Sequence, residues 1–91
     1  MATKNNPGSF DCYANAKPDE PMFILLGRDP VAGVLVALWV QLRRLIGKVD
    51  AEQLKEAQVC AGSMSAYAAM LGKQELIDAA ISAVKRVVER F

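Results

Sequence analysis

The residues with the clearest potential for chemistry lie in one segment, from Pro18 to Ala32, which reads PDEPMFILLGRDPVA. An arginine guanidinium binds phosphate or carboxylate groups, carboxylates accept hydrogen bonds from ribose hydroxyls or base amines, and aromatic rings stack on bases. Grouped around the apolar run in the middle of this segment, such side chains would form a pocket for a small nucleotide-type ligand. The candidate ligand-binding residues are Tyr13, Asp19, Glu20, Phe23, Arg28 and Asp29.

The same polar residues also have a structural interpretation, and the two interpretations stay open with equal weight. Asp29 stands directly before Pro30, which is typical of a helix N-terminus, so its carboxylate would cap that helix. Arg28 would then pair with Asp29 or with Glu20. In that case the segment positions helices and binds no ligand.

The chain lacks the groups that most enzymes use. It has no histidine, the commonest general base and a frequent metal ligand. Cys12 therefore has no histidine to activate its thiol, and Asp19 and Glu20 are neighbours rather than a facing acid–base pair. No phosphate-binding loop or Cys/His metal pattern occurs, and we interpret the glycines as scattered stops and turns. We expect a protein without catalytic activity, metal or cofactor.

Composition favours a protein that associates with copies of itself. The chain has 91 residues, enough for one domain, and 53% of them are hydrophobic, above the usual share of about 45–50%. A short chain with this apolar load often completes its core as a homo-oligomer. The formal net charge is only +1, from 11 basic and 10 acidic residues, so nucleic acid is not expected as a partner.

Two features predict a cytoplasmic protein. The first 20 residues are polar and carry no secretory signal, so Cys12 and Cys60 are expected to be free thiols in a reducing compartment. The longest apolar stretch, residues 30–42, is shorter than the roughly 20 residues that cross a membrane. We expect this stretch to be a buried helix and expect no membrane contact.

The chain before this helix is predicted to hold only short elements. Residues 1–9 are polar and typical of a disordered tail, which leaves a single helical domain over residues 10–91. Phe10 and Tyr13 are at helical spacing, enough for one turn that docks both rings on the core. The run from Met22 to Leu26 is too short to be typed by periodicity: Pro21 and Gly27 on either side favour a short helix, and a buried strand stays open.

Three main helices are predicted, over residues 30–46, 50–71 and 75–91, so the fold class is all-α, a small helical bundle. Gly47 and Gly72 would end the first two, and Asp50 would begin the second in a capping box with Gln53. Small residues dominate the inward side of the second helix, so a neighbouring helix can approach closely. These inward positions are Leu54, Ala57, Ala61, Met64, Ala68 and Leu71. The stripe of the last helix is Leu76, Ile77, Ala80, Ile81, Val84, Val87, Val88 and Phe91.

The first main helix is apolar on more than one side. Val36 and Val40 lie off its broad stripe, so we expect the stripe to pack inside the subunit and the other side to meet a partner subunit. Trp39, the only tryptophan, is expected to fill the core or the subunit interface. The predicted oligomer interface is therefore Val36, Trp39 and Val40. The broad stripe consists of Val31, Val34, Leu35, Leu38, Trp39, Leu42, Leu45 and Ile46.

Over residues 10–64 the chain resembles a group of short, mostly uncharacterised proteins encoded by tailed phages and prophages. In that group an acidic-Pro-x-Phe-x-Leu run with Arg-Asp or Gln-Asp is followed by a helix that contains tryptophan. The resemblance implies a phage-like origin and expression inside a bacterial host, and it supplies no activity. The matching residues are Glu20, Pro21, Phe23, Leu25, Arg28, Asp29, Pro30, Ala32 and Trp39, with Glu56, Ala57, Ala61 and Met64 further on.

Small accessory phage proteins commonly disable a host protein or sequester a host signalling molecule. The first hypothesis is a non-enzymatic protein that inhibits a host defence protein through a helical surface. The alternative is an oligomeric sponge that holds a small nucleotide-type signalling ligand around residues 18–32. A structural component of the virion is a third hypothesis.

Overall fold

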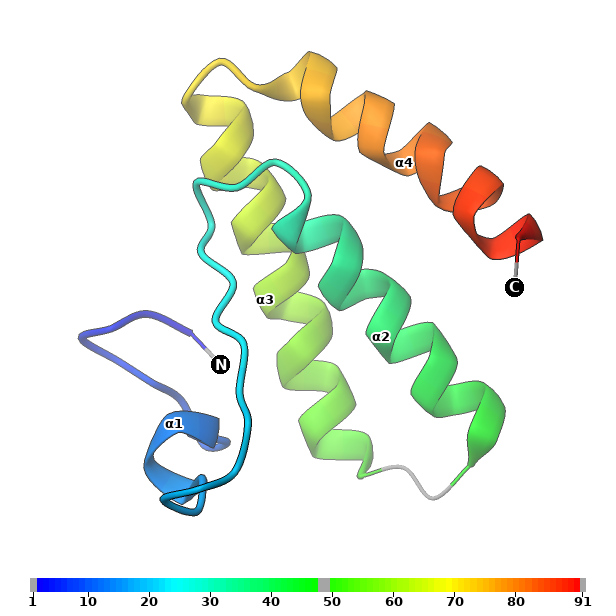
Figure 1. Ribbon diagram of the computed structural model, residues 1–91. Coiled ribbons are helices and arrows are strands. Elements are labelled where there is room, and N and C mark those ends of the chain that lie inside the picture. Colours follow the sequence, from blue (N-terminus) through cyan, green and yellow to red (C-terminus); the bar gives the residue numbers. More distant parts are fainter. Residues whose placement is uncertain (1, 48–49, 91) are drawn as a thin grey trace.

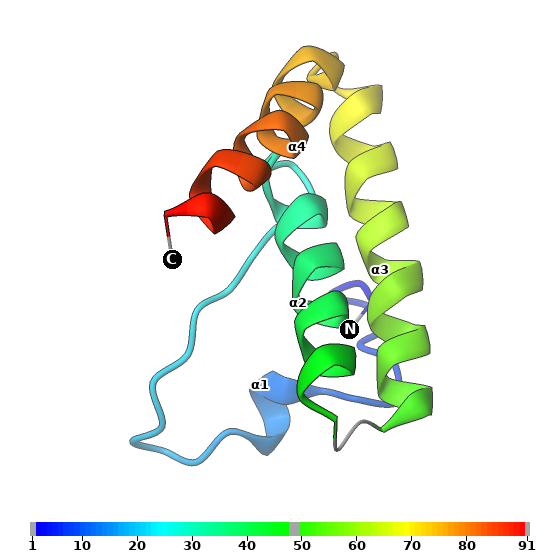
Figure 2. The same ribbon diagram turned by 90° about the vertical axis from the view of Figure 1, so that its right-hand side faces the viewer.

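In the computed structural model, which describes residues 2–47 and 50–90, all regular structure is helical (Figure 1). α2 and α3 lie side by side and run in opposite directions, and α4 folds back from the end of α3 toward the start of α2 (Figures 1 and 2). The predicted all-α fold with three main helices is confirmed. None of the helices in this described part is long and apolar enough to cross a bilayer. The helices are α1 (Cys12–Asn15), α2 (Ala32–Ile46), α3 (Ala51–Met70) and α4 (Gln74–Glu89).

Helix α3 has clear signals at both ends. The Asp50 carboxylate accepts hydrogen bonds from the backbone N–H groups of Glu52 and Gln53, at 3.0 and 3.1 Å, as expected of the capping residue. After the last turn Gly72 adopts a φ of +82°, which glycine reaches without a steric penalty, and its N–H donates to the Ala69 carbonyl at 2.9 Å. The predicted cap and stop of this helix are both confirmed.

Helix α2 begins at Ala32 rather than at the predicted Pro30. The Asp29 carboxylate accepts a hydrogen bond from the Val31 N–H at 2.9 Å, and the Asp29 carbonyl accepts one from the Ala32 N–H at 3.1 Å. This tight turn holds Pro30 outside the helix. The helix ends as predicted, before Gly47, which has a φ of +74°.

α2 and α3 meet backbone to backbone at Gly33. A Cβ atom added to Gly33 would lie 2.7 Å from the carbonyl oxygen of Ala61 and 3.0 Å from the backbone nitrogen of Ser65. A side chain cannot occupy this position unless the two helices move apart. Gly33 therefore has a packing role inside a helix, which corrects the expectation that every glycine is a stop or a turn.

The core between α2 and α3 consists of small and medium-sized side chains. Val40 of α2 is 1% exposed and packs with Leu54 and Ala57 of α3, and Val36 lies partly buried against them. The predicted small-residue inward face of α3 is confirmed at four of its positions. The other two buried residues of α3 are Ala61 and Ala68.

Helix α1 amounts to a single turn. Asp11 caps it by accepting a hydrogen bond from the Ala14 N–H at 3.1 Å. Phe10 is half-buried and lines a hollow on α3 together with Glu52. Tyr13 is 74% exposed, so the expectation that both rings dock on the core is wrong for Tyr13. One turn that follows Phe10 leaves Tyr13 on its solvent side.

Residues 22–26 form neither the short helix that the sequence favours nor the strand that it leaves open. Five residues are too few to nucleate a helix unaided, and Pro18 and Pro21 offer no N–H groups to continue one from α1. The described chain contains no strand for the run to pair with. The segment crosses from α1 to the start of α2 as an irregular connection (Figure 1).

Helix α4 is attached to the rest of the fold at its beginning. Ile77 is the buried residue of this helix, and the Lys73 ammonium group just before it donates a 2.7 Å hydrogen bond to the Arg28 carbonyl. Further along, α4 diverges from α3 and its C-terminal end stands apart from the helix pair (Figure 2). The predicted start at Glu75 is one residue late, and the predicted stripe member Phe91 lies outside the described residues.

The contact at Gly33 predicts opposite outcomes for two helical glycines. Gly33→Ala pushes a methyl group against the Ala61 carbonyl and is expected to lower the free energy of unfolding by about 1–3 kcal/mol. Gly62→Ala is the matched control, because nothing lies within 4 Å of the added Cβ. Alanine is the better helix former, so this variant is expected to gain about 0.5–1 kcal/mol. Urea unfolding followed by circular dichroism measures both, and equal shifts would contradict the close contact.

Candidate functional site

The residues predicted to bind a nucleotide-type ligand are divided between the two ends of the connection from α1 to α2. Asp19 and Glu20 follow α1, whereas Arg28 and Asp29 precede α2, and the connection between these points bows away from the helix pair (Figure 2). All four side chains are exposed. Within one chain the predicted polar ring around residues 22–26 is therefore not assembled.

Hydrogen bonds give two of these carboxylates a local structural role. Glu20 accepts a hydrogen bond from the Lys17 N–H at 3.0 Å, and its own N–H donates to the Lys17 carbonyl at 3.1 Å, which closes the turn after α1. Asp29 holds the turn that starts α2 through its bond to Val31. Both carboxylates therefore hold turns, which is a structural role, but Asp29 is not the predicted N-cap of α2, because Val31 holds that position.

The two predicted stacking residues lie open to solvent. Phe23 is 85% exposed, and Tyr13 has a similar exposure on α1. A small-molecule site usually encloses most of its ligand between apolar walls. Neither ring provides such a wall within a single chain, so the structure does not bring the predicted residues into a common pocket.

An exposed apolar feature is the side of α2 that points away from α3, which we call the outer face of α2. Trp39 is 37% exposed there and Leu45 82% exposed. These side chains belong to the broad stripe that the sequence predicts as core, so the structure places most of that stripe on the surface and leaves Val34 and Leu38 half-buried. The outer face of α2 consists of Leu35, Trp39, Leu42, Leu45 and Ile46.

Val36 and Val40 lie on the inner side of α2, which corrects their predicted place at a partner subunit. Gly33, Val36 and Val40 are spaced i, i+3 and i+7 and so share one helical face. Because Gly33 must face α3 closely, the two valines face α3 as well. A glycine followed by valines at this spacing was the sequence signal for the inner side. Of the predicted interface residues, Trp39 is the one that remains at the surface.

Arg43 borders the outer face of α2, whereas Arg44 lies toward α3. The guanidinium carbon of Arg43 lies 5.9 Å from the centre of the Trp39 ring, within the range of a cation–π interaction. Arg44 donates a 3.2 Å hydrogen bond to the Gln58 side chain of α3. Both arginines are in the last turn of α2, where positive charge interacts favourably with the helix dipole. Tryptophan and arginine are enriched at protein–protein interfaces.

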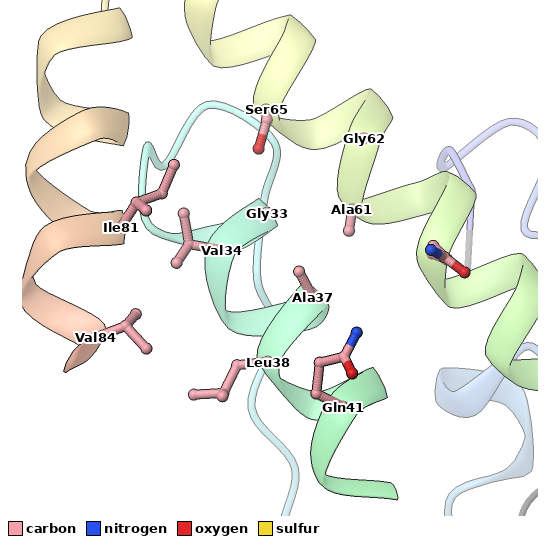
Figure 3. Close-up of a pocket in the computed structure, with 11 residues that line it drawn as sticks. Gly33, Val34, Ala37, Leu38, Gln41, Ala61, Gly62, Ser65, Ile81 and Val84 are labelled. Atoms are coloured by element: carbon pink, nitrogen blue, oxygen red, sulfur yellow. The ribbon is translucent and has the colours of Figure 1, made fainter. Parts of the chain in front are cut away.

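A groove is lined by the three main helices: α2 and α3 supply most of its residues, and α4 supplies Ile81 and Val84 (Figure 3). Its volume is about 450 Å³. Val34 and Leu38 of α2 point across the opening toward Ile81 and Val84 of α4 (Figure 3). The groove is mainly aliphatic; its polar groups are the side chains of Gln41, Gln58 and Ser65.

The chain exposes more solvent-accessible surface than a compact monomeric protein of the same mass. Its solvent-accessible area is 7217 Å², whereas a folded protein of 9.9 kDa is expected to expose about 5,200 Å². The radius of gyration is 13.8 Å, against about 12 Å expected for a compact chain of this length. The excess, about 2,000 Å², comes from exposed segments outside the helices, where Phe23 is 85% exposed, and from apolar side chains left open on α2 and α4.

Reactive groups are scattered over the fold. Cys12 is an exposed free thiol on α1, and Cys60 is a half-buried free thiol on α3. No group of three or more His, Cys, Asp or Glu side chains in the described part of the chain is placed to hold a metal ion. The features that gather several side chains in one place are the outer face of α2 and the groove.

Comparison with protein-family models, curated proteins and solved structures gives no match for this chain. The resemblance to phage-encoded proteins stays a prediction from the residues. Function has to be argued from the surfaces described above.

The side of α2 that faces α3 is the opposite of the one predicted, and this determines which of its apolar residues stabilise the fold. Val40→Ala empties part of the core and is expected to lower the free energy of unfolding by about 1.5–3 kcal/mol. Leu45→Ala removes more apolar atoms from an exposed position and is expected to change it by less than about 0.5 kcal/mol. Thermal and urea unfolding compare the two variants, and a larger loss for Leu45→Ala would contradict the orientation.

Proposed function

We propose that this protein acts by binding another protein through the outer face of α2, without catalysis. The observation that supports this most directly is the exposure of five large apolar side chains on one side of a single helix. Apolar surface of this kind, left open on a folded chain, is characteristic of interaction sites. Trp39 stacked with Arg43 supplies the residue types that most often dominate binding energy.

The spacing of the outer face suits one mode of recognition. Leu35, Trp39, Leu42 and Ile46 are at positions i, i+4, i+7 and i+11, so they form one continuous line along α2. A helix that presents such a line binds in an apolar groove on its partner. The convex outer face of α2 is suited to enter such a groove, whereas a small ligand needs a concave site.

The setting follows from the resemblance to phage-encoded proteins. If this protein is made inside a bacterial host, its partner is a host protein in the cytoplasm. Occupying an apolar groove on that protein blocks the groove for the host's own partners, which inhibits the host protein without any chemical step. A defence protein is the partner class that such accessory proteins commonly target.

Site-specific photo-crosslinking in cells of the bacterial host tests this proposal. A photoreactive amino acid at position 42 is expected to capture one reproducible heteromeric adduct, which mass spectrometry identifies. The same amino acid at position 82, an exposed serine on the polar side of α4, is the control and is expected to capture no such adduct. Leu35→Glu in the position-42 protein is expected to lower the adduct yield about tenfold or more, because it buries a charge in the interface.

Two results would contradict the proposal. The first is an adduct at position 42 that contains only two copies of this chain. The second is an equal heteromeric yield at positions 42 and 82, or with and without Leu35→Glu. Circular dichroism of the purified variants shows whether their helices are intact.

A further inference from the structure

Helix α4 is strongly amphipathic, but only the beginning of its apolar side is buried against the rest of the chain. Ile77 is buried where the helix starts, whereas Ile81 is 58% exposed, and Val87 and Val88 near its end are about equally exposed. Polar and charged residues fill the opposite side of the helix. The part of this apolar side beyond Ile77 is largely exposed to solvent and can be buried only by contact with another apolar surface.

Part of the apolar side of α4 lines the groove, through Ile81 and Val84. Ile77, Ile81, Val84 and Val88 are at positions i, i+4, i+7 and i+11, and we call these four residues the α4 stripe. Ile81 and Val84 point toward Val34 and Leu38 of α2, and the space between the two walls is open (Figure 3). The α4 stripe contains no polar side chain, so the matching occupant is another aliphatic helix.

We propose that a second copy of this chain fills the groove, with α4 of one copy packed antiparallel against α4 of the other. The groove has open aliphatic walls, which suit an apolar occupant, and the charges beside the α4 stripe are complementary to themselves, which selects a copy of the same chain.

Two charges beside the α4 stripe favour the antiparallel arrangement. Asp78 and Lys85 are seven residues apart, so they lie about 20° from each other on the same edge of the stripe. They are placed almost symmetrically about the centre of the stripe, between Ile81 and Val84. An antiparallel pair related by a two-fold axis therefore brings Asp78 of each copy opposite Lys85 of the other. A parallel pair related by a two-fold axis would place these charges on opposite edges of the contact, where they would not pair.

Both charged groups are available for this contact. Asp78 and Lys85 are exposed in the single chain, and the Asp78 carboxylate accepts one hydrogen bond, from the Gln74 side chain at 3.0 Å. A carboxylate has lone pairs for further donors, so this bond leaves room for a lysine ammonium group. The contact uses α4 and the groove and leaves the outer face of α2 uncovered. This inference therefore goes beyond the proposed function and does not depend on it.

A charge exchange tests the arrangement. Sedimentation velocity of the wild-type protein is expected to show a dimer, or an assembly built of an even number of chains. Asp78→Lys and Lys85→Asp each replace two attractive contacts per dimer by repulsive ones and are expected to weaken association roughly tenfold. The double variant with both changes restores opposite charges and is expected to return association to near the wild-type level.

An apolar disruption provides the second test. Val84→Glu places a carboxylate in the α4 stripe and is expected to weaken association at least about a hundredfold. Ser82→Glu, on the polar side of the same helix, is the matched control and is expected to leave association unchanged. Circular dichroism is expected to show equal helix content for both variants.

Three results would overturn the inference. The first is a wild-type protein that is monomeric at about 0.1 mM. The second is a Val84→Glu protein that associates as strongly as the Ser82→Glu protein, and the third is a double charge variant that associates no better than the single variants. Each of these concerns only pairing through α4. A heteromeric adduct at position 42 would still support the proposed function, so the two proposals can fail separately.

Discussion

The close approach of α2 and α3 at Gly33 decides the rest of the structure. Any side chain at this position would collide with the Ala61 carbonyl, so the two backbones can touch only because Gly33 has none. The contact fixes the rotation of α2 about its own axis. Val36 and Val40 share the face of Gly33 and become the inner side. The side of α2 that carries Leu35 and Trp39 must then face away from α3, however apolar it is.

The core around this contact buries little apolar area, and for that reason large apolar side chains remain exposed on the surface. Alanines such as Ala57 and Ala61 allow two helices to come close, but each buries little apolar area. Large side chains consequently remain open in two regions of different chemistry. The outer face of α2 combines Trp39 with a bordering arginine, as interfaces between unlike proteins often do. The groove beside α4 is aliphatic and is flanked by charges arranged symmetrically, which suits a copy of the same chain.

The positions of the candidate ligand residues depend on the path of the connection between α1 and α2. Asp29 was predicted to be the N-cap of α2, but Val31 holds that position and makes no side-chain cap bond. The Asp29 carboxylate accepts a hydrogen bond from the Val31 N–H in the turn before the helix instead. The polar ring of Asp19, Glu20 and Arg28 required the connection between them to fold back on itself. Side-chain type and spacing carry no information on that path. The prolines and the absence of a pairing strand in the described chain leave the connection irregular and its ends apart.

The sequence by itself determined the helical content, the cap at Asp50, the stops at Gly47 and Gly72, and the small-residue side of α3. These features depend on hydrogen bonds and backbone angles within a few residues of each other. Only the tertiary structure decided which apolar side of α2 is inside. Both sides satisfy helical periodicity, and hydrophobicity favours the one that ends up exposed. The choice rests on backbone clearance between two helices at Gly33, a steric property of the pair that neither helix has alone.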